Sequence, residues 1–263
     1  MSALADGELL YEVRGQTGWI TLNRPRARNA LTFAMYEGVA EICAGLAPGG
    51  PVRAVVVIGA GEKAFAAGTD INQFRRFDQP GDALAYEARM DRAFSAVERC
   101  AIPTLAAIAG ACTGGGAGLA AACDLRIATA GLRFGFPIAR TLGNCLSVAN
   151  LARLCALIGA GRVADVIFTA RLVGAEEALS IGLLSEIVPS HAALVERAGE
   201  LAGMLASHAP LTLRATKEGL RRLRTEGARA RDDDLIEEVY MSRDFREGLA
   251  AFLSKRKPEW TGK

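Results

Sequence analysis

The glycine-rich stretch at residues 103–124 constrains the fold more than any other part of the chain. A short apolar run, residues 105–109, has the length of a buried strand and stops at Gly110. Three consecutive glycines, residues 114–116, follow it, and Leu119 opens an apolar run typical of a buried helix. A strand, a glycine turn and a helix place bare backbone N–H groups at the positive end of a helix dipole. The stretch therefore predicts a site for an anion or an oxyanion, although the same glycines would also permit tight strand–helix packing.

A second interpretation of this stretch is a dinucleotide-binding turn. The run from Gly116 through Gly118 to Ala121 matches the pattern G-x-G-x-x-G/A. That pattern requires an acidic residue about 20 positions later, which binds the ribose. Asp124 comes too soon, and no further acidic residue occurs before Asp165. A nucleotide-dependent oxidoreductase is therefore only a weak alternative.

The charge balance excludes several classes of partner. The 263 residues carry 31 basic and 29 acidic side chains, a formal net charge of +2, so we expect neither nucleic acid nor a membrane surface as a partner. The six cysteines show no C-x-x-C pair and no zinc spacing, which favours buried thiols in a reducing compartment and no metal site. The N-terminal segment, with Asp6 and Glu8, does not have the pattern of a signal peptide. On these grounds we expect a cytoplasmic protein.

Histidine usage excludes a further class of enzyme. His191 and His208 are the two histidines, and both lie at expected helix ends, where a structural role is the simpler interpretation. The chain also lacks a G-x-S-x-G sequence. A serine hydrolase with a serine–histidine pair is therefore not expected.

Periodicity and breakers predict a mixed α/β chain whose last third is helical. Strands are expected at 9–13, 19–22, 54–58, 105–109, 124–129, 132–136 and 184–188. Helices are expected at 33–46, 82–100, 144–158, 161–170 and 174–179, and from 190 to about 255 with breaks at Pro210 and Gly227.

Four stretches together resemble the crotonase superfamily, the enoyl-CoA hydratase/isomerase family. They are residues 22–31, residues 64–71, residues 109–124 and residues 252–257, and their order and spacing fit almost the whole chain. The resemblance implies an α/β fold, a crotonase-like spiral of repeated β-β-α units. Residues 1–190 would form this core with the CoA-thioester site. Residues 191–263 would form a C-terminal helical trimerisation region that contributes to the CoA site, so that the protein is a homo-trimer or a hexamer built as a dimer of trimers.

The resemblance also implies an oxyanion hole for a CoA thioester. The two backbone N–H donors would be those of Thr69 and Gly115, which hold the thioester oxygen while it gains negative charge. Coenzyme A would be part of the substrate rather than a permanently bound cofactor. The residues implied in its binding are Arg26, Ala27, Ala66, Ala67, Gly68, Asp70, Ile71 and Lys255. A helix-capping role is the simpler interpretation for Asp70, and Lys255 is equally well explained as part of a solvated chain end.

The sequence departs from the family's hydratases at two positions. Those hydratases carry two glutamates, one that activates water and one that delivers a proton. Here the corresponding residues are Gly118 and Ile138. Arg140 and Asn144 would line the wall that the missing glutamate leaves. Asp91 is a tentative replacement acid or base, although an exposed aspartate beside two arginines is the simpler interpretation.

These observations predict an enzyme that acts on an acyl-CoA thioester through a stabilised enolate. Isomerisation, decarboxylation or another reaction with fewer acid–base groups fits the residues better than simple hydration. The alternative is a non-catalytic acyl-CoA-binding protein that has this fold but has lost the glutamates.

Overall fold

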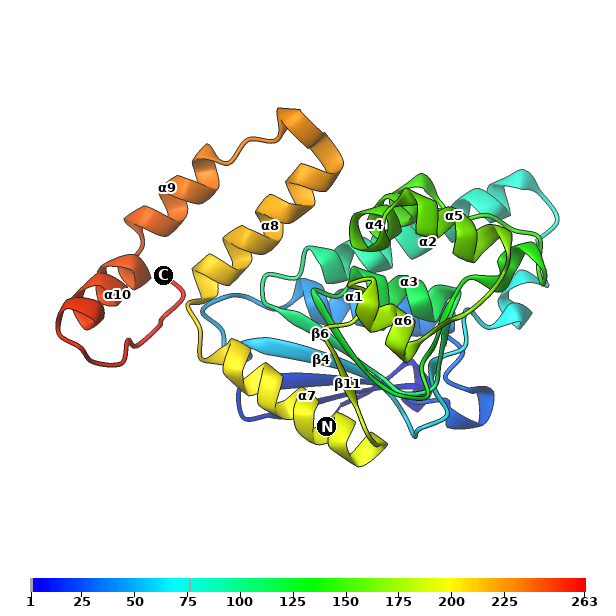
Figure 1. The fold of residues 1–263 in the computed structure, drawn as a ribbon, viewed down its shortest axis with the longest axis horizontal. Helices are drawn as coiled ribbons and strands as arrows, with labels where there is room; N and C mark the ends of the chain where they lie inside the picture. Colours follow the sequence, from blue (N-terminus) through cyan, green and yellow to red (C-terminus); the bar gives the residue numbers. More distant parts are fainter. Residues whose placement is uncertain (1, 76) are drawn as a thin grey trace.

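The computed structural model describes residues 2–75 and 77–263, and its framework is two β-sheets (Figure 1). The larger sheet has the order β1-β2-β3-β4-β6-β8-β11, and the smaller has the order β10-β9-β7-β5. The strands of the larger sheet are β1 (Ser2–Leu4), β2 (Leu9–Arg14), β3 (Thr17–Leu22), β4 (Ala54–Gly59), β6 (Thr104–Ile108), β8 (Leu125–Thr129) and β11 (Glu186–Val188). Those of the smaller sheet are β5 (Ala64–Ala66), β7 (Ala111–Thr113), β9 (Arg133–Gly135) and β10 (Val173–Gly174).

Ten α-helices lie within the described residues. They are α1 (Phe33–Ala44), α2 (Pro80–Glu98), α3 (Gly115–Ala122), α4 (Val148–Ile158), α5 (Ala160–Phe168), α6 (Ala175–Ser180), α7 (His191–Ala206), α8 (Pro210–Glu226), α9 (Asp233–Met241) and α10 (Arg243–Leu253). Short 3₁₀ turns include η2 (Pro25–Ala27), η3 (Ile71–Phe74) and η4 (Pro137–Ala139). No helix in this part of the chain is both long enough and apolar enough to cross a membrane.

The chain winds as a spiral that adds one strand to each sheet per turn. β4 and β5 are followed by α2, β6 and β7 by α3, and β8 and β9 by α4. Within each sheet these strands pair in parallel, β4 with β6 and β6 with β8 in one, β5 with β7 and β7 with β9 in the other. This arrangement confirms the expected α/β fold built from repeated β-β-α units. The sequence did not reveal β5 and β7, because three-residue strands carry too little periodicity.

Hydroxyl side chains fix where several helices begin. Thr32 Oγ1 accepts a hydrogen bond from the N–H of Met35, and Ser147 Oγ accepts one from the N–H of Asn150, so each caps its helix. The helix expected from residue 144 therefore begins only at Val148. Residues 139–147 are left as a loop beside α2.

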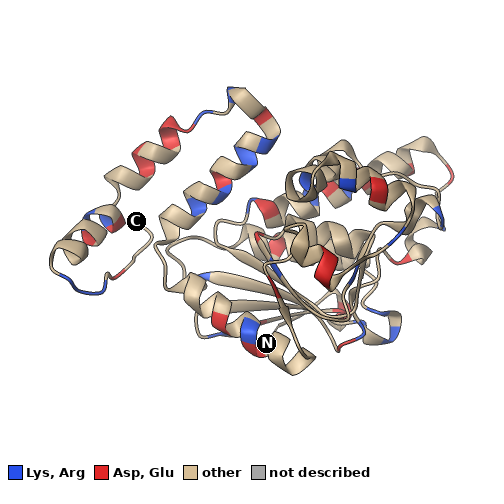
Figure 2. Cartoon of the chain, viewed as in Figure 1, with Lys and Arg blue, Asp and Glu red and all other residues tan. Residues whose placement is uncertain are grey.

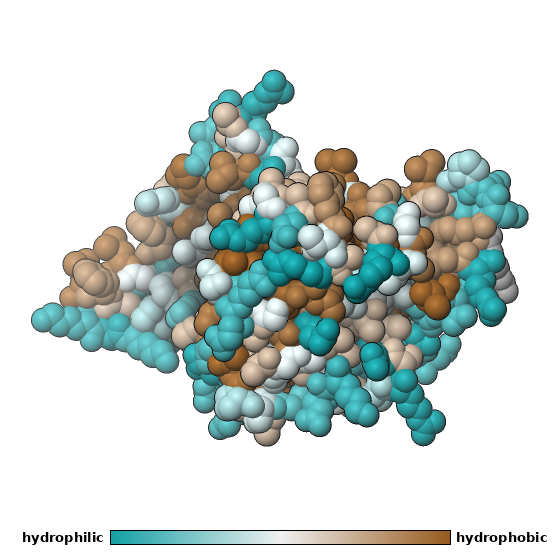
Figure 3. Space-filling model, turned by 45° about the vertical axis from the view of Figure 1, so that its right-hand side comes forward, coloured by the Kyte–Doolittle hydropathy of each residue, from teal (hydrophilic) through white to brown (hydrophobic). Residues whose placement is uncertain are grey.

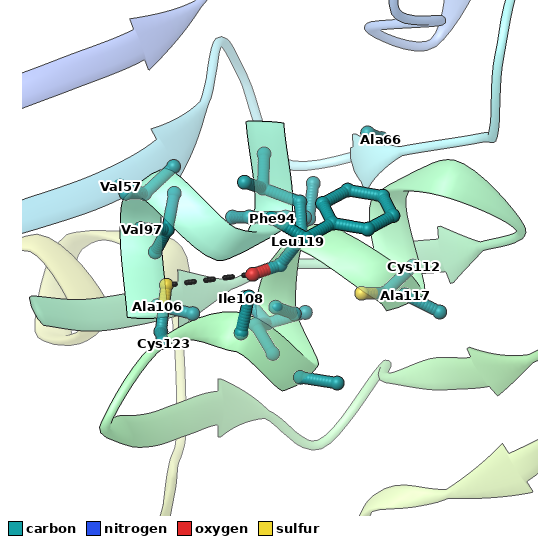
Figure 4. Close-up of a cluster of buried hydrophobic side chains, with 14 of the residues drawn as sticks. Val57, Ala66, Phe94, Val97, Ala106, Ile108, Cys112, Ala117, Leu119 and Cys123 are labelled. Atoms are coloured by element: carbon teal, nitrogen blue, oxygen red, sulfur yellow. Dashed lines mark hydrogen bonds between the residues drawn. The ribbon is translucent and has the colours of Figure 1, made fainter. Parts of the chain in front are cut away.

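Helix α3 lies at the centre of the core. Its residues from Gly116 onward are buried, and Leu119 packs among side chains from several elements (Figure 4). The labelled neighbours in that view come from β4, β5, α2, β6 and β7, and they include Val57, Ala66, Phe94 and Ile108. The tight surroundings fix the direction of the helix, and with it the direction of its N-terminal N–H groups.

Helix α7 covers the opposite face of the larger sheet. Leu194, Ala198 and Ala202 are fully buried against strand residues that include Val56 and Leu105. Residues 191–206 therefore pack on the core, whereas the sequence assigns them to the C-terminal helical region. Among the C-terminal helices, it is α8, α9 and α10 that project from the body of the molecule (Figure 1).

Helices α8 to α10 form a projecting arm, and Lys217 on α8 connects this arm to the core. Its ammonium lies 2.7 Å from a carboxylate oxygen of Asp124 and donates to the carbonyl of Val97. Asp124 in turn accepts hydrogen bonds from both the N–H and the hydroxyl of Thr104. Helix α8 is thus held by Asp124, two residues after the end of α3.

Arg126 supports the C-terminal end of α3 from within the core. Its guanidinium is buried and donates to four carbonyl oxygens, those of Ala120, Cys123, Asp124 and Leu183. The last carbonyls of a helix have no intrahelical partner, so this side chain supplies one.

We predict that Arg126→Leu lowers the free energy of unfolding by about 2–3 kcal/mol, because it leaves buried carbonyl groups without donors. Urea unfolding followed by circular dichroism measures the change. Arg133→Leu is the control, because that side chain is exposed on β9. Equal stability of the two variants would contradict the supporting role of Arg126.

Candidate functional site

The loop after β5 leaves the backbone N–H group of Thr69 outside the pairing that holds its neighbours. The N–H of Leu31 donates to the carbonyl of Gly68 (2.8 Å), and the N–H of Asp70 donates to the carbonyl of Leu31 (2.9 Å). These bonds form a parallel bridge between Leu31 and Thr69. In such a bridge the N–H of Thr69 points away from Leu31. It has no acceptor among the described residues.

The turn between β7 and α3 presents a second N–H group. The N–H of Gly114 donates to the carbonyl of Gly135 (3.0 Å), and Gly114 has a positive φ of 52°. Gly115 is the first residue of α3, so its N–H has no acceptor within the helix and stands at the positive end of the helix dipole.

The two loops meet closely enough that side chains are excluded from the turn. A Cβ at Gly115 would lie 1.9 Å from the hydroxyl oxygen of Tyr36 and 2.9 Å from Thr69 Oγ1. A Cβ at Gly116 would lie 2.3 Å from the carbonyl oxygen of Ala66. The structure therefore brings Thr69 and Gly115 together, as the sequence predicts. Two fixed N–H donors at one point can stabilise negative charge on a single oxygen atom.

Two tyrosines hold the side chain of Thr69. Its Oγ1 lies 2.9 Å from the hydroxyl of Tyr36 and 3.0 Å from that of Tyr86. Burial raises the pKa of both tyrosines above the usual value, so both keep their protons. The threonine hydroxyl is thereby engaged, and only the backbone of Thr69 is left to bind a ligand.

A cavity of about 40 Å³ lies beside this junction. Gly114, Gly115 and Gly118 form one side of it, and Ile138 and Asn144 contribute to another. The remaining lining residues are Tyr86, Glu87, Met90, Phe94, Phe136, Cys145, Leu146 and Asn150. Gly118, Ile138 and Asn144 therefore all line the cavity, whereas Arg140 is exposed and is not among the lining residues.

The ring of Phe94 fills the space beside Gly118. A Cβ at Gly118 would lie 2.8 Å from that ring. A glutamate at this position would have no room unless Phe94 moved. The absence of the first hydratase carboxylate is thus matched by a side chain on α2 that occupies its space.

Asp91 does not line the cavity. Its carboxylate accepts a hydrogen bond from the hydroxyl of Ser147 (2.8 Å) and lies 3.8 Å from the guanidinium of Arg153. The side chain therefore contributes to the contact between α2 and α4, because the hydroxyl of Ser147 and the buried guanidinium of Arg153 both interact with it.

Glu87 is the acidic residue that lines the cavity among those described, and sequence reasoning missed it. It lies one helical turn before Asp91 on α2 and on the same side as Met90 and Phe94. Burial raises the pKa of its carboxyl above the usual range, and the negative charge of Asp91 raises it further. The helical spacing of Glu87, Met90 and Phe94 is the signal that could have revealed it, but it required knowing which face of α2 meets the glycine turn.

The predicted CoA-binding residues lie largely together. The turn with Arg26 and Ala27 is exposed, and the N–H of Ala67 donates to the carbonyl of Arg28 beside it. Ala66 and Gly68 are buried, and Ile71 is 62% exposed.

Asp70 closes the same loop. Its carboxylate caps η3 through the N–H of Asn72 and pairs with Arg24 at 2.9 Å. Burial pushes the pKa of Asp70 upward, but these hydrogen bonds and the charge of Arg24 outweigh it and lower the pKa. The capping role expected for Asp70 is confirmed.

Lys255 is not brought to this site. It follows α10 in the projecting arm, at the opposite end of the molecule from α2 in Figure 1. The expected contact between Lys255 and a CoA phosphate is therefore not made within one chain, because α8 carries the end of the chain away from the loops.

A larger cavity, of about 420 Å³, lies between α8 and the core but offers no comparable chemistry. Its charged side chains pair with one another: Glu98 contacts Arg153 and Arg224, and Lys217 contacts Asp124. The pairs of Arg224 and Lys217 hold α8 to the core. Among the described residues, no group of three or more histidine, cysteine, aspartate or glutamate side chains is placed to hold a metal ion.

The spiral fold and its paired backbone donors define the class to which the protein belongs, the crotonase-like α/β proteins. A model of the enoyl-CoA hydratase/isomerase family matches residues 13–263, and the chain belongs to this family.

Relatives support the same assignment along nearly the full length. The chain is 32% identical to a short-chain-enoyl-CoA hydratase of Clostridium acetobutylicum, over 95% of this chain and 96% of that protein. It is 30% identical to a 2,3-dehydroadipyl-CoA hydratase of Escherichia coli, over 97% and 99%. The crystal structure of an enoyl-CoA hydratase/carnithine racemase from Magnetospirillum magneticum superposes with a TM-score of 0.88 at 32% identity, covering 99% of this chain and 97% of that one.

We predict that Gly115→Ala destabilises the protein by about 1–3 kcal/mol, because the new methyl group overlaps the hydroxyl of Tyr36. Tyr36→Phe removes that hydroxyl and should restore part of the loss in the double variant, as a double-mutant cycle would measure. Thermal unfolding provides the comparison. A fully stable Gly115→Ala variant would contradict the close approach of the two loops.

Proposed function

We propose that this enzyme binds a short-chain acyl-CoA thioester and stabilises its enolate, with isomerisation favoured over simple hydration. The observation that carries the proposal is the pair of N–H groups of Thr69 and Gly115 beside a cavity that lacks both hydratase carboxylates. The thioester oxygen would accept both hydrogen bonds and gain negative charge as the α-carbon loses its proton. Loss of one such donor typically costs about 3–4 kcal/mol of transition-state stabilisation.

The size and lining of the cavity support a small acyl group. A water molecule occupies roughly 10–15 Å³ by this measure, so a cavity of about 40 Å³ holds about three waters. Its walls are mainly apolar, from Met90, Phe94, Phe136 and Ile138. An acyl chain of about four carbons fits this space better than a long one.

The rest of the CoA moiety would lie along the two surface loops. The exposed turn at Arg26 and Ala27 and the backbone of Ala66, Ala67 and Gly68 would contact it, with Ile71 at the edge. Their closeness to the N–H pair supports this assignment.

Hydration is disfavoured for a specific reason. Adding water across a double bond needs one group that activates the water and one that delivers a proton. Gly118 and Ile138 stand at the two positions, and the ring of Phe94 occupies the space beside Gly118. A 1,3-proton shift needs one group only, and decarboxylation also needs fewer groups than hydration.

We predict that but-3-enoyl-CoA is isomerised while crotonyl-CoA is hydrated very slowly or not at all. Loss of positioned acid–base help typically costs about 10² to 10⁴ in rate for each group. Chromatography of the CoA products measures both reactions. Hydration of crotonyl-CoA that outpaces isomerisation would overturn the preference.

Binding measured by calorimetry separates the enzyme from its alternatives. Acetyl-CoA and crotonyl-CoA should bind, and free butyrate and NAD⁺ should not. Thioester binding without turnover of any enoyl-CoA would favour the non-catalytic acyl-CoA-binding protein. No thioester binding at millimolar concentration, which corresponds to about −4 kcal/mol, would refute the whole proposal.

We also propose that the arm assembles the protein into a trimer or a dimer of trimers. The arm exposes several large apolar side chains, and Figure 3 shows apolar surface (brown) on the projecting part. They are Leu220, Leu223, Ile236, Tyr240, Met241, Leu249, Phe252 and Leu253. Basic residues predominate along α8, and the charged residues of α9 are acidic (Figure 2); polar side chains of this kind are typical of the rim of an interface. Within this proposal, the arm with α8 to α10 is the oligomerisation region, and the core extends through α7.

We predict that light scattering at micromolar concentration gives the mass of a trimer or a hexamer. Phe252→Glu with Leu253→Glu should shift the distribution toward smaller species, because buried unpaired charges are costly. Arg229→Glu is the control, a charge change on an exposed turn. A monomeric wild type would refute the assembly.

A further inference from the structure

We propose that Glu87 is the residue that moves the proton between the α- and γ-carbons of an enoyl-CoA bound in this site. The inference rests on the proposed function and adds to it the group that performs the chemistry. It places this group on α2, at a position separate from both hydratase glutamates.

The position of Glu87 follows from the pitch of α2. Residues 87, 90 and 94 fall on one side of the helix, and all three line the cavity together with Gly115. Asp91 lies one turn later, but its carboxylate is taken by Ser147 and faces Arg153. Among the described residues that line the cavity, Glu87 is the sole carboxylate beside the N–H pair.

The surroundings of Glu87 suit a base that removes a proton from carbon. The side chain is half-buried, beside Met90 and Phe94, and no hydrogen bond or ion pair to it is formed by the described residues. Burial and the charge of Asp91 raise the pKa of its carboxyl. A raised pKa lies closer to neutral pH, and general-base catalysis is most effective when the pKa of the base is near the operating pH.

The reaction balances with one carboxylate and no other reagent. Glu87 takes a proton from the α-carbon of but-3-enoyl-CoA, and the C–H electrons move to the thioester oxygen, held by the N–H groups of Thr69 and Gly115. The resulting dienolate takes the same proton at its γ-carbon. The C3=C4 double bond is lost, the C2=C3 double bond forms, and Glu87 returns to its ionised state.

Glu87→Gln tests this role with little change in shape. The variant should isomerise but-3-enoyl-CoA about 10² to 10⁴ times more slowly than the wild type. It should also lose the exchange of α-protons of butyryl-CoA into heavy water, measured by NMR. Acetyl-CoA affinity by calorimetry should stay within about threefold, which shows that the site has folded. Glu196→Gln is the matched control, because Glu196 is exposed on α7, and it should leave all three measurements unchanged.

The pH dependence provides a second readout. The base acts when ionised, so the rate rises as pH passes the pKa of Glu87, and the raised pKa moves this rise to higher pH. Asp91→Asn removes one charge that raises it and should move the midpoint to lower pH. The titratable and charged groups near Glu87 are Tyr86 and Asp91 on α2, Tyr36 on α1, Cys145 in the loop before α4, and Arg153 on α4, which acts through Asp91.

The outcomes separate this inference from the proposed function. Isomerisation or α-proton exchange that survives in Glu87→Gln at wild-type rate would overturn the role of Glu87 and leave the enolate enzyme standing. A wild type that binds acetyl-CoA but neither isomerises nor exchanges would overturn the role of Glu87 together with the enolate chemistry. A midpoint that Asp91→Asn leaves in place would show that another group titrates, and would also overturn it.

Discussion

The close approach of two backbone segments, residues 66–69 and 114–116, is the constraint on which the rest of the structure depends. A single Cβ at Gly116 would lie 2.3 Å from the carbonyl of Ala66, so the two segments can meet only at glycine. Around this junction the packing is correspondingly rigid. Helix α3 is surrounded by core side chains, and Arg126 satisfies the carbonyls at its far end. At this junction Gly115 lies beside the side chain of Thr69, and the proposed function uses the backbone N–H groups of both residues.

The chemistry of the site follows from what surrounds these donors. The hydroxyl groups of Tyr36 and Tyr86 engage the side chain of Thr69, which leaves its backbone as the functional part. Phe94 fills the space that a carboxylate at position 118 would need. In the proposed reaction the acid–base function lies on another element, α2, whose Glu87 lines the same cavity and has a raised pKa. Membership of the family establishes the fold, while the proposed reaction depends on a few residues that line the cavity.

The C-terminal part of the chain consists of two structurally different parts. Helix α7 completes the core, since its apolar face covers the larger sheet. Helices α8 to α10 form an arm that is tied to the core by Lys217 and Asp124 and exposes apolar side chains. Large exposed apolar surface is uncommon in a monomer, and for this reason the proposed assembly is placed on the arm.

The sequence by itself indicated the longer strands, most of the helices and the glycine turn, and the family resemblance indicated the absence of both glutamates. These are local properties: an apolar run such as 54–58 predicts a buried strand, and Thr32 predicts a helix start. The helix expected from residue 144 begins only after its cap at Ser147. The sequence placed Thr69 and Gly115 together only through a resemblance, since they lie far apart in the chain. Tertiary structure alone decided which face of α2 meets the glycine turn. That choice places Glu87 in the cavity and turns Asp91 toward α4. The course of α8 carries Lys255 away from the site. Periodicity indicates which face of a helix is buried, but it does not indicate which other element packs on that face. The packing partner depends on how all the turns of the spiral are arranged in space.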